Sequence, residues 1–97
     1  MNIVFLESTV DDLRWFLSYY NTVFSEGFEK AQKYYHETLH ALHAHPHIGK
    51  EVLETHGIRE ILIPQTPFSF VYYLSGDEIR IIRIRDARSK RPRNANI

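Results

Sequence analysis

The spacing of apolar residues changes along this chain of 97 residues, and that change constrains its fold more than any other feature. Between residues 8 and 45, apolar side chains recur at steps of three and four, which is the period of an α-helix. Pro46 and Gly49 end this pattern, and later apolar residues alternate as they do in half-buried strands. Helices followed by a run of strands are typical of an α+β protein.

We predict six elements in the order strand, helix, helix, strand, strand, strand. Residues 3–7 suit the first strand, and residues 58–86 form an antiparallel meander with a tight turn at "SGD". The predicted fold is a two-helix hairpin packed on one face of a twisted antiparallel sheet, in a single domain of residues 1–97. The predicted core faces carry Leu13, Phe16, Leu17, Tyr20 and Phe24 in the first helix, Phe28, Ala31, Tyr35, Leu39 and Leu42 in the second, and Phe68, Phe70, Tyr72 and Leu74 in a strand.

Three polar residues mark the start of the first helix. Ser8 with Asp11 three residues later resembles a capping box, in which the hydroxyl satisfies a free amide of the first turn. Asp11 and Asp12 also lie where the helix dipole favours negative charge. The expected roles of all three are therefore local to this helix terminus.

Positive charge is concentrated near the end of the chain. The stretch "RIIRIRDARSKRPR", residues 80–93, holds six arginines and one lysine. Strict strand alternation places Arg83 and Arg85 on the face opposite Arg80. A β-bulge near residues 81–82 would instead bring all three arginines to one side. The sequence is compatible with both arrangements.

The zero net charge of the chain conceals two halves of opposite charge. Residues 1–57 carry four Lys and Arg against eight Asp and Glu, and residues 58–97 carry eight against four. The halves can attract each other within the fold, or the basic half can dock on an acidic nucleic acid or protein. Residues 89–97 have no apolar period, and we expect them to form a flexible basic tail.

Several stretches together resemble the ParE/RelE superfamily of toxins from type II toxin–antitoxin modules, and the ParE branch most of all. They are "FLESTVDDLRWFLSYY", "LHAHPHIGKEV", "GIREILI", "FSFVYYLSGDEIRIIRI" and "RDARSKR", in this order between residue 3 and about residue 91. The resemblance implies a helical hairpin on a twisted antiparallel sheet. It also implies a plasmid-stabilisation toxin that a cognate antitoxin protein neutralises.

The two main activities of this superfamily differ in whether the toxin cuts a bond. RelE-like members are ribosome-dependent mRNA endonucleases, whose clustered Lys and Arg side chains stabilise charge on a phosphate. ParE-like members inhibit DNA gyrase by protein–protein contact. When this sequence is aligned with the RelE pattern, the basic positions of that pattern are occupied by Glu60, Leu62, Pro64 and Ser69. Arg88 alone matches a basic catalytic position of the pattern. No tyrosine follows residue 73 to supply the C-terminal aromatic of that pattern.

The resemblance therefore favours a binding protein over an enzyme, with no catalytic residues and no cofactor. The implied target is DNA gyrase. The alternatives are a RelE-like mRNA endonuclease acting on the ribosome and a degenerate module that binds its antitoxin without toxicity. The expected target-binding surface comprises Arg83, Arg85, Arg88, Lys90 and Arg91.

Aromatic residues on the helices are the expected antitoxin-binding surface. Trp15, Tyr19 and Tyr34 lie off the apolar stripes or at their margin. They either pack at the edge of the core or form an apolar surface that a partner covers. In the family, the antitoxin adds a helix and an extended strand, and an open sheet edge invites such strand addition. A homodimer is left open.

Other features bear on the class of protein. The chain has no cysteine, which excludes disulfides and thiolate chemistry. No apolar run approaches the ~18 residues of a membrane span, and the N-terminus does not resemble a signal peptide, so we expect a cytoplasmic protein. His36, His40 and His43 share one helical face at steps of four and three. No carboxylate or cysteine completes a ligand set at typical spacing, so we expect an exposed face and no metal site.

Overall fold

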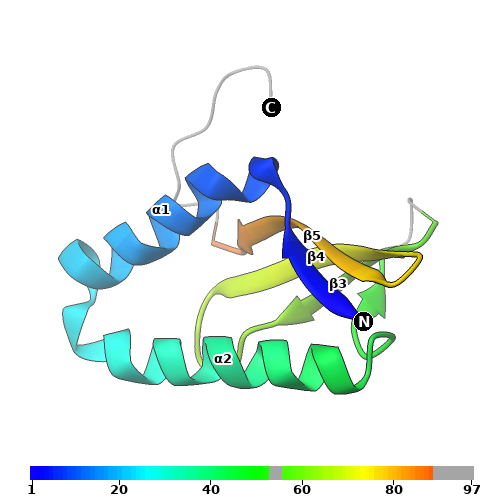
Figure 1. The fold of residues 1–97 in the computed structure, drawn as a ribbon. Helices are drawn as coiled ribbons and strands as arrows, with labels where there is room; N and C mark the ends of the chain where they lie inside the picture. The colour runs from blue at the N-terminus through cyan, green and yellow to red at the C-terminus, as the bar shows by residue number, and fades with distance from the viewer. Residues whose placement is uncertain (53–55, 89–97) are drawn as a thin grey trace.

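The computed structural model of this chain describes residues 1–52 and 56–88. In this part of the chain, two helices pack against one face of a five-stranded sheet, as Figure 1 shows. The predicted α+β class, and the helical pair that precedes the meander, are confirmed. The predicted tail at residues 89–97 lies outside the described residues.

The helical part of the chain contains two α-helices with irregular turns between them. A 3-10 turn, Glu7–Thr9, leads into α1, Val10–Ser18, which a π-helical turn, Tyr19–Val23, continues. A second 3-10 turn, Ser25–Gly27, leads into α2, Phe28–Ala44. α2 stops two residues before Pro46, because the residue that precedes a proline is disfavoured in helical conformation.

The strands are β1 (Asn2–Phe5), β2 (Lys50–Glu51), β3 (Ile58–Leu62), β4 (Phe68–Ser75) and β5 (Glu78–Asp86), in the spatial order β1-β5-β4-β3-β2. The last three form the predicted antiparallel meander. β1 runs parallel to β5, so the sheet is mixed and not purely antiparallel as predicted. A long helical connection allows this, because parallel strands need a crossover and cannot be joined by a tight turn. The two-residue strand β2 is too short to leave a sequence pattern.

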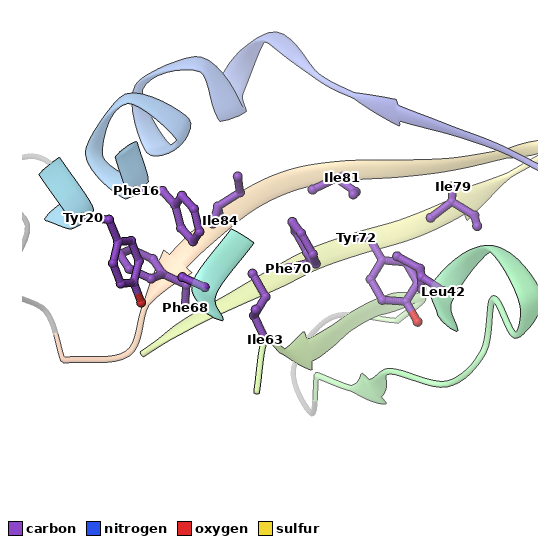
Figure 2. Packing of buried hydrophobic residues seen from close by; sticks show 11 residues of the cluster. Phe16, Tyr20, Leu42, Ile63, Phe68, Phe70, Tyr72, Ile79, Ile81 and Ile84 are labelled. Carbon is purple, nitrogen blue, oxygen red and sulfur yellow. The ribbon is translucent and has the colours of Figure 1, made fainter. Parts of the chain in front are cut away.

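The core lies between the helices and the inner face of the sheet, which is the face that the helices cover (Figure 2). β4 contributes Phe68, Phe70 and Tyr72, and all three are fully buried, as the alternation predicted. Burying one such side chain contributes about 1.5–3 kcal/mol to the free energy of unfolding. The other members of the buried cluster are Phe16, Tyr20, Ala31, Leu42, Ile63, Ile79, Ile81 and Ile84.

The first helix buries less of its predicted core face than the second. Phe16 and Tyr20 are buried, but Leu17 is 43% exposed and Phe24 is 46% exposed, so the prediction is wrong at these two positions. Leu17 lines two open grooves, one between α1 and α2 and one between α1 and the end of β1. The predicted stripe of the second helix is confirmed, since Ala31 and Leu42 are buried and the rest of the stripe packs against the core.

β5 contains a β-bulge at Ile82. Ile81 and Arg83 pair with consecutive residues of β4, so Ile82 has no partner in the ladder. The extra residue resets the alternation and turns Arg80, Arg83 and Arg85 to the outer face, which is the face of the sheet opposite the helices. Of the two arrangements that the sequence left open, the structure contains the bulged one.

Two of the polar residues at the start of α1, Ser8 and Asp12, bond to β5. No side chain caps α1, so the predicted capping box is wrong. Ser8 Oγ donates to the Ile82 carbonyl oxygen at 2.7 Å, and Asp12 Oδ2 accepts from the Ile84 amide at 2.9 Å. Because β1 ends at Phe5, these side chains satisfy backbone groups on the edge of β5 that β1 no longer covers.

One tyrosine holds the loop between α2 and β2. The Tyr72 hydroxyl accepts a hydrogen bond from the Gly49 amide at 2.9 Å and donates one to the Pro46 carbonyl oxygen at 2.8 Å. A Cβ atom at Gly49 would lie 2.6 Å from that hydroxyl, so the close approach requires glycine. These contacts bring the chain to the edge of the sheet, where β2 pairs with β3.

Candidate functional site

Three arginines of β5 share the outer face of the sheet, which no helix of the described residues covers. Arg80, Arg83 and Arg85 each donate a hydrogen bond from Nε to a carboxylate. The acceptors, in that order, are Glu78 Oε1 at 2.8 Å, Asp12 Oδ2 at 3.0 Å and Glu60 Oε2 at 2.6 Å. For Arg83 and Arg85, pairing through Nε leaves both terminal nitrogens without a hydrogen bond to any described residue.

Asp12 joins α1 to the arginine-bearing strand. Its side chain is 2% exposed, whereas that of Arg83 is 45% exposed. One carboxylate oxygen accepts from both Arg83 Nε and the Ile84 amide. A buried carboxylate is costly unless it is paired and hydrogen-bonded, so these contacts fix β5 and Arg83 relative to α1.

Glu60 of β3 fixes Arg85 in a similar way. Ser69 Oγ of β4 donates a short hydrogen bond to Glu60 Oε2, and Arg85 Nε donates to the same oxygen. Burial alone raises the pKa of the Glu60 carboxyl, but the hydrogen bonds from Arg85 and Ser69, with the charge of Arg85, lower it below its usual value. Glu60 is therefore ionised at neutral pH and offsets the charge of Arg85.

This ion pair lies in an open groove of about 540 Å³ at the end of the sheet. The groove contains three of the four positions at which the RelE pattern has basic residues, since Glu60, Leu62 and Ser69 line it. Of the two cations among the described lining residues, Arg85 bonds to Glu60, and Lys50 lies opposite Glu60 in the strand register. The described residues that line it are Lys50, Glu51, Val52, Glu60, Leu62, Ser69, Arg85 and Ala87.

Two arginines of the expected target-binding surface therefore lie on the outer face, whereas Arg88 belongs to a different cluster. Its backbone amide and Nε donate to Asp86 Oδ1 at 3.0 and 3.1 Å, and Nη2 donates to Asp86 Oδ2 at 3.0 Å. Nη1 donates to the Tyr19 hydroxyl at 2.8 Å, and the guanidinium carbon lies 4.2 Å from the centroid of that ring. Arg88 thus uses most of its donors to join the end of β5 to the first helical segment.

Trp15 completes this cluster. Its indole Nε1 donates to Asp86 Oδ2 at 3.0 Å, and its ring centroid lies 6.3 Å from that of Tyr19. Burial alone raises the pKa of the Asp86 carboxyl, but the hydrogen bonds from the Arg88 side chain, Trp15 and the Arg88 amide lower it. Asp86, whose side chain is 3% exposed, is therefore a buried carboxylate with several donors around it.

The three residues of the expected antitoxin-binding surface do not lie together. Trp15 and Tyr19 are half-buried neighbours that pack against the core and bond to Asp86 and Arg88. Tyr34 lies on α2 beside an apolar groove toward β3, where Gln65 Nε2 donates to its hydroxyl at 3.3 Å. The remaining two residues of the target-binding surface, Lys90 and Arg91, lie outside the described residues.

Sequence reasoning singled out the arginines but not the acids that hold them. The sequence pattern predicts a helix-dipole role for Asp12, places Glu60 at a basic position of the RelE pattern, and predicts no role for Asp86. A signal for Asp12 is present, because Ser8, Asp12 and Trp15 follow steps of four and three and form a polar stripe on the helix. For Glu60 and Asp86 the signal depends on the strand register, which the sequence left open.

The predicted histidine face is exposed. His36, His40 and His43 all lie on the solvent side of α2. Among residues 1–52 and 56–88, no group of three or more His, Asp or Glu side chains is arranged to hold a metal ion. None of the helices in that part of the chain combines the length and the apolar character needed to cross a membrane.

Replacing Asp86 tests the role of this buried carboxylate. Because its pKa is lowered in the folded state, it stabilises the fold above the unfolded-state value of about 3.9 and stops doing so as the pH falls below that value. Asp86→Asn should reduce the free energy of unfolding at neutral pH by about 1–3 kcal/mol. It should also flatten the loss of stability between about pH 5 and about pH 3.

Urea unfolding followed by the fluorescence of the single tryptophan measures both effects. Asp77→Asn, in the exposed turn between β4 and β5, is the matched control and should keep the wild-type acid slope. Equal slopes for the wild type and Asp86→Asn would contradict the assignment.

Comparison with known proteins bears on the fold of this chain. No family model matches the sequence, and no curated protein matches it. The fold is similar to that of a solved chain described as the chromosomal ParDE toxin–antitoxin system from P. aeruginosa, with a TM-score of 0.69 and 26% sequence identity. The match covers 89% of this chain and 95% of that chain. This likeness supports a ParE-like toxin fold.

Proposed function

We propose that this chain is the toxin subunit of a type II toxin–antitoxin module and acts in the cytoplasm on DNA gyrase by protein–protein contact. The similarity to a ParDE chain over almost the full length of both chains supports a toxin of this kind. A cognate antitoxin protein neutralises it. In this proposal the chain binds its target and does not cut a bond.

The observation that carries this proposal is the way in which Arg83 and Arg85 on the outer face are exposed and paired. Arg83 and Arg85 are exposed and present their terminal nitrogens to solvent, while Nε of each is paired with an acid. The groove beside them contains Glu60 in place of a cation, and a carboxylate there opposes the charge that develops on a phosphate during RNA cleavage. Guanidinium groups that keep free donors suit charge-assisted contact with carboxylates of a protein surface.

The proposal predicts that toxicity depends on Arg83 and Arg85 in the folded protein. Arg83→Ala/Arg85→Ala, expressed without antitoxin, should relieve growth arrest at equal levels of soluble protein, because each arginine can supply charge-assisted bonds worth about 1.5–3 kcal/mol. Arg14→Ala is the matched control. Arg14 is an exposed arginine on α1 whose ion pair with Asp11 is also exposed, and its replacement should leave growth arrest unchanged.

Two assays with purified protein separate the target classes. Wild-type protein should inhibit gyrase supercoiling or stabilise gyrase-cleaved DNA, and the double variant should not. Cleaved mRNA in a reconstituted translation mixture, with gyrase unaffected, would identify a RelE-like endonuclease instead. Normal growth under forced expression of soluble wild-type protein would identify a non-toxic module.

We also propose that the antitoxin covers an apolar strip along α1, defined by Val10, Leu13 and Leu17. Leu13 and Leu17 line both grooves beside this helix, of about 370 Å³ toward β1 and about 220 Å³ toward α2. Val10 is 45% exposed and Leu17 is 43% exposed. Contiguous exposed apolar side chains of this kind mark a protein interaction surface. Trp15 and Tyr19, which were expected in the antitoxin-binding surface, line neither groove and bond instead to Asp86 and Arg88.

Leu17→Glu tests this surface, because it places a charge where an apolar partner would have to bury it. The affinity for the small protein encoded by the adjacent reading frame should fall at least about tenfold, which corresponds to ~1.4 kcal/mol. Val23→Glu is the control, since Val23 is 63% exposed and lines neither groove. Titration calorimetry measures both affinities, and equal affinities for the two variants would refute the proposed strip.

A further inference from the structure

We propose that Asp12 and Glu60 are positioning residues, which hold Arg83 and Arg85 through the Nε atoms of these arginines. The terminal nitrogens of both arginines then point away from the sheet and form a paired site for carboxylates of an acidic partner. This inference rests on the proposed function, because it concerns the same arginines. It assigns a role in target binding to two acids that touch no target themselves.

The atoms used in each ion pair are the first argument. A guanidinium group is planar and carries five N–H donors, so fixing Nε and the side-chain stem fixes the directions of the remaining four. Arg83 and Arg85 both use Nε internally, at 3.0 Å to Asp12 and 2.6 Å to Glu60. Among described residues, neither arginine has a hydrogen-bond partner at Nη1 or Nη2, and both side chains remain nearly half exposed, at 45% and 46%.

The anchoring of the acids is the second argument. Asp12 accepts a second hydrogen bond from the Ile84 amide, and Glu60 accepts a second one from Ser69 Oγ. Each carboxylate is thereby held by a group that is part of the sheet. Asp12 comes from α1, beside β5, and Glu60 comes from β3, which lies beyond β4 on the other side of β5, so the arginines are held from opposite sides.

Two exposed ion pairs on the helices lack this arrangement. Arg14 and Asp11 lie 3.4 Å apart with side chains 78% and 74% exposed. Lys33 and Glu37 lie 4.0 Å apart with side chains 66% and 56% exposed. Such exposed pairs are screened and do not hold a side chain in one orientation. The contrast indicates that the acids beside Arg83 and Arg85 do more than balance charge.

The spacing of the two arginines indicates the ligand. They are two residues apart on one strand and share one face, so their Cα atoms are separated by about 7 Å. Each ion pair is internally neutral, so recognition depends on the free N–H donors and less on long-range attraction. Two carboxylates on a protein surface at a similar spacing would each accept a charge-assisted hydrogen bond from a guanidinium group that is already oriented.

A different role for the acids makes the opposite prediction. If Asp12 and Glu60 masked the arginines by occupying the place of a target carboxylate, removing their charge would strengthen growth arrest. If they position the arginines, removing their charge weakens it. The direction of the effect therefore separates the two roles.

The experiment uses near-isosteric neutral variants of the full chain. Asp12→Asn and Glu60→Gln retain an oxygen that can accept from the Ile84 amide and from Ser69 Oγ, but lose the charge that holds the arginine. We expect each variant to stay folded by urea unfolding and to need about tenfold more soluble protein for the same growth arrest, equivalent to ~1.4 kcal/mol. The matched controls are Asp11→Asn on the same helix and Glu51→Gln in the same groove, and both should behave as wild type.

A spectroscopic measurement tests positioning without reference to any target. In isotope-labelled protein, the Nε–H protons of Arg83 and Arg85 should exchange with solvent more slowly than that of Arg14. Asp12→Asn should abolish this protection at Arg83 alone, and Glu60→Gln at Arg85 alone. Exchange in the wild type as fast as that of Arg14 would overturn the inference.

A double-mutant cycle connects positioning to toxicity. In an Arg83→Ala background, Asp12→Asn should cause no further loss of growth arrest, because the side chain that it orients is absent. A further loss as large as in the wild-type background, or stronger arrest in either single acid variant, would also overturn the inference. If Arg83→Ala/Arg85→Ala itself leaves growth arrest unchanged, the proposed target-binding surface fails, and the exchange measurement still decides whether the acids position the arginines.

Discussion

An extra residue in β5 determines on which side of the sheet each charged group of that strand lies. Because Ile82 has no partner on β4, Ile84 points into the core, and Asp86 lies buried beneath the cluster that Arg88 forms. Without the bulge, Arg83 and Arg85 would face the core, and Ile84 would face solvent. Burial of two arginines without the acids that now pair with them would cost several kcal/mol each. The bulge is thus a condition for both the core and the arginine-bearing outer face.

The same strand is joined to the first helical segment by polar contacts at a regular spacing. Side chains spaced four, three and four residues apart along this helical segment form hydrogen bonds with every second residue of the chain from Ile82 onward. The pairs are Ser8 with Ile82, Asp12 with Ile84, Trp15 with Asp86, and Tyr19 with Arg88. The helix that carries the apolar strip proposed for the antitoxin therefore also holds Arg83, one of the two arginines that we propose for target contact. Arg88 contributes to this joint more than to the open surface, so Arg83 and Arg85 carry the proposed recognition.

The sequence was sufficient for the α+β class, the helical pair and the meander, because their apolar periods are long and regular. It did not determine the parallel pairing of β1, which has only four residues and no turn that fixes its direction. The exposure of Leu17 and Phe24 was also missed, because a periodic stripe indicates a helix face and not how much of that face is covered. The acids Asp12 and Glu60 could not be assigned in advance, since their partners depend on a register that one unpaired residue shifts.

The register of β5 against β4 can be measured directly, because the chain has no cysteine of its own. The bulged register places Ser69 opposite Arg85, whereas a regular register would place it opposite Ile84. Directly opposed residues have Cα atoms about 4.5–5.5 Å apart, which suits a disulfide. We predict that Ser69→Cys/Arg85→Cys forms an intramolecular disulfide under mild oxidation and that Ser69→Cys/Ile84→Cys remains reduced. A disulfide in the second variant and none in the first would contradict the placement of the arginines on which this account depends.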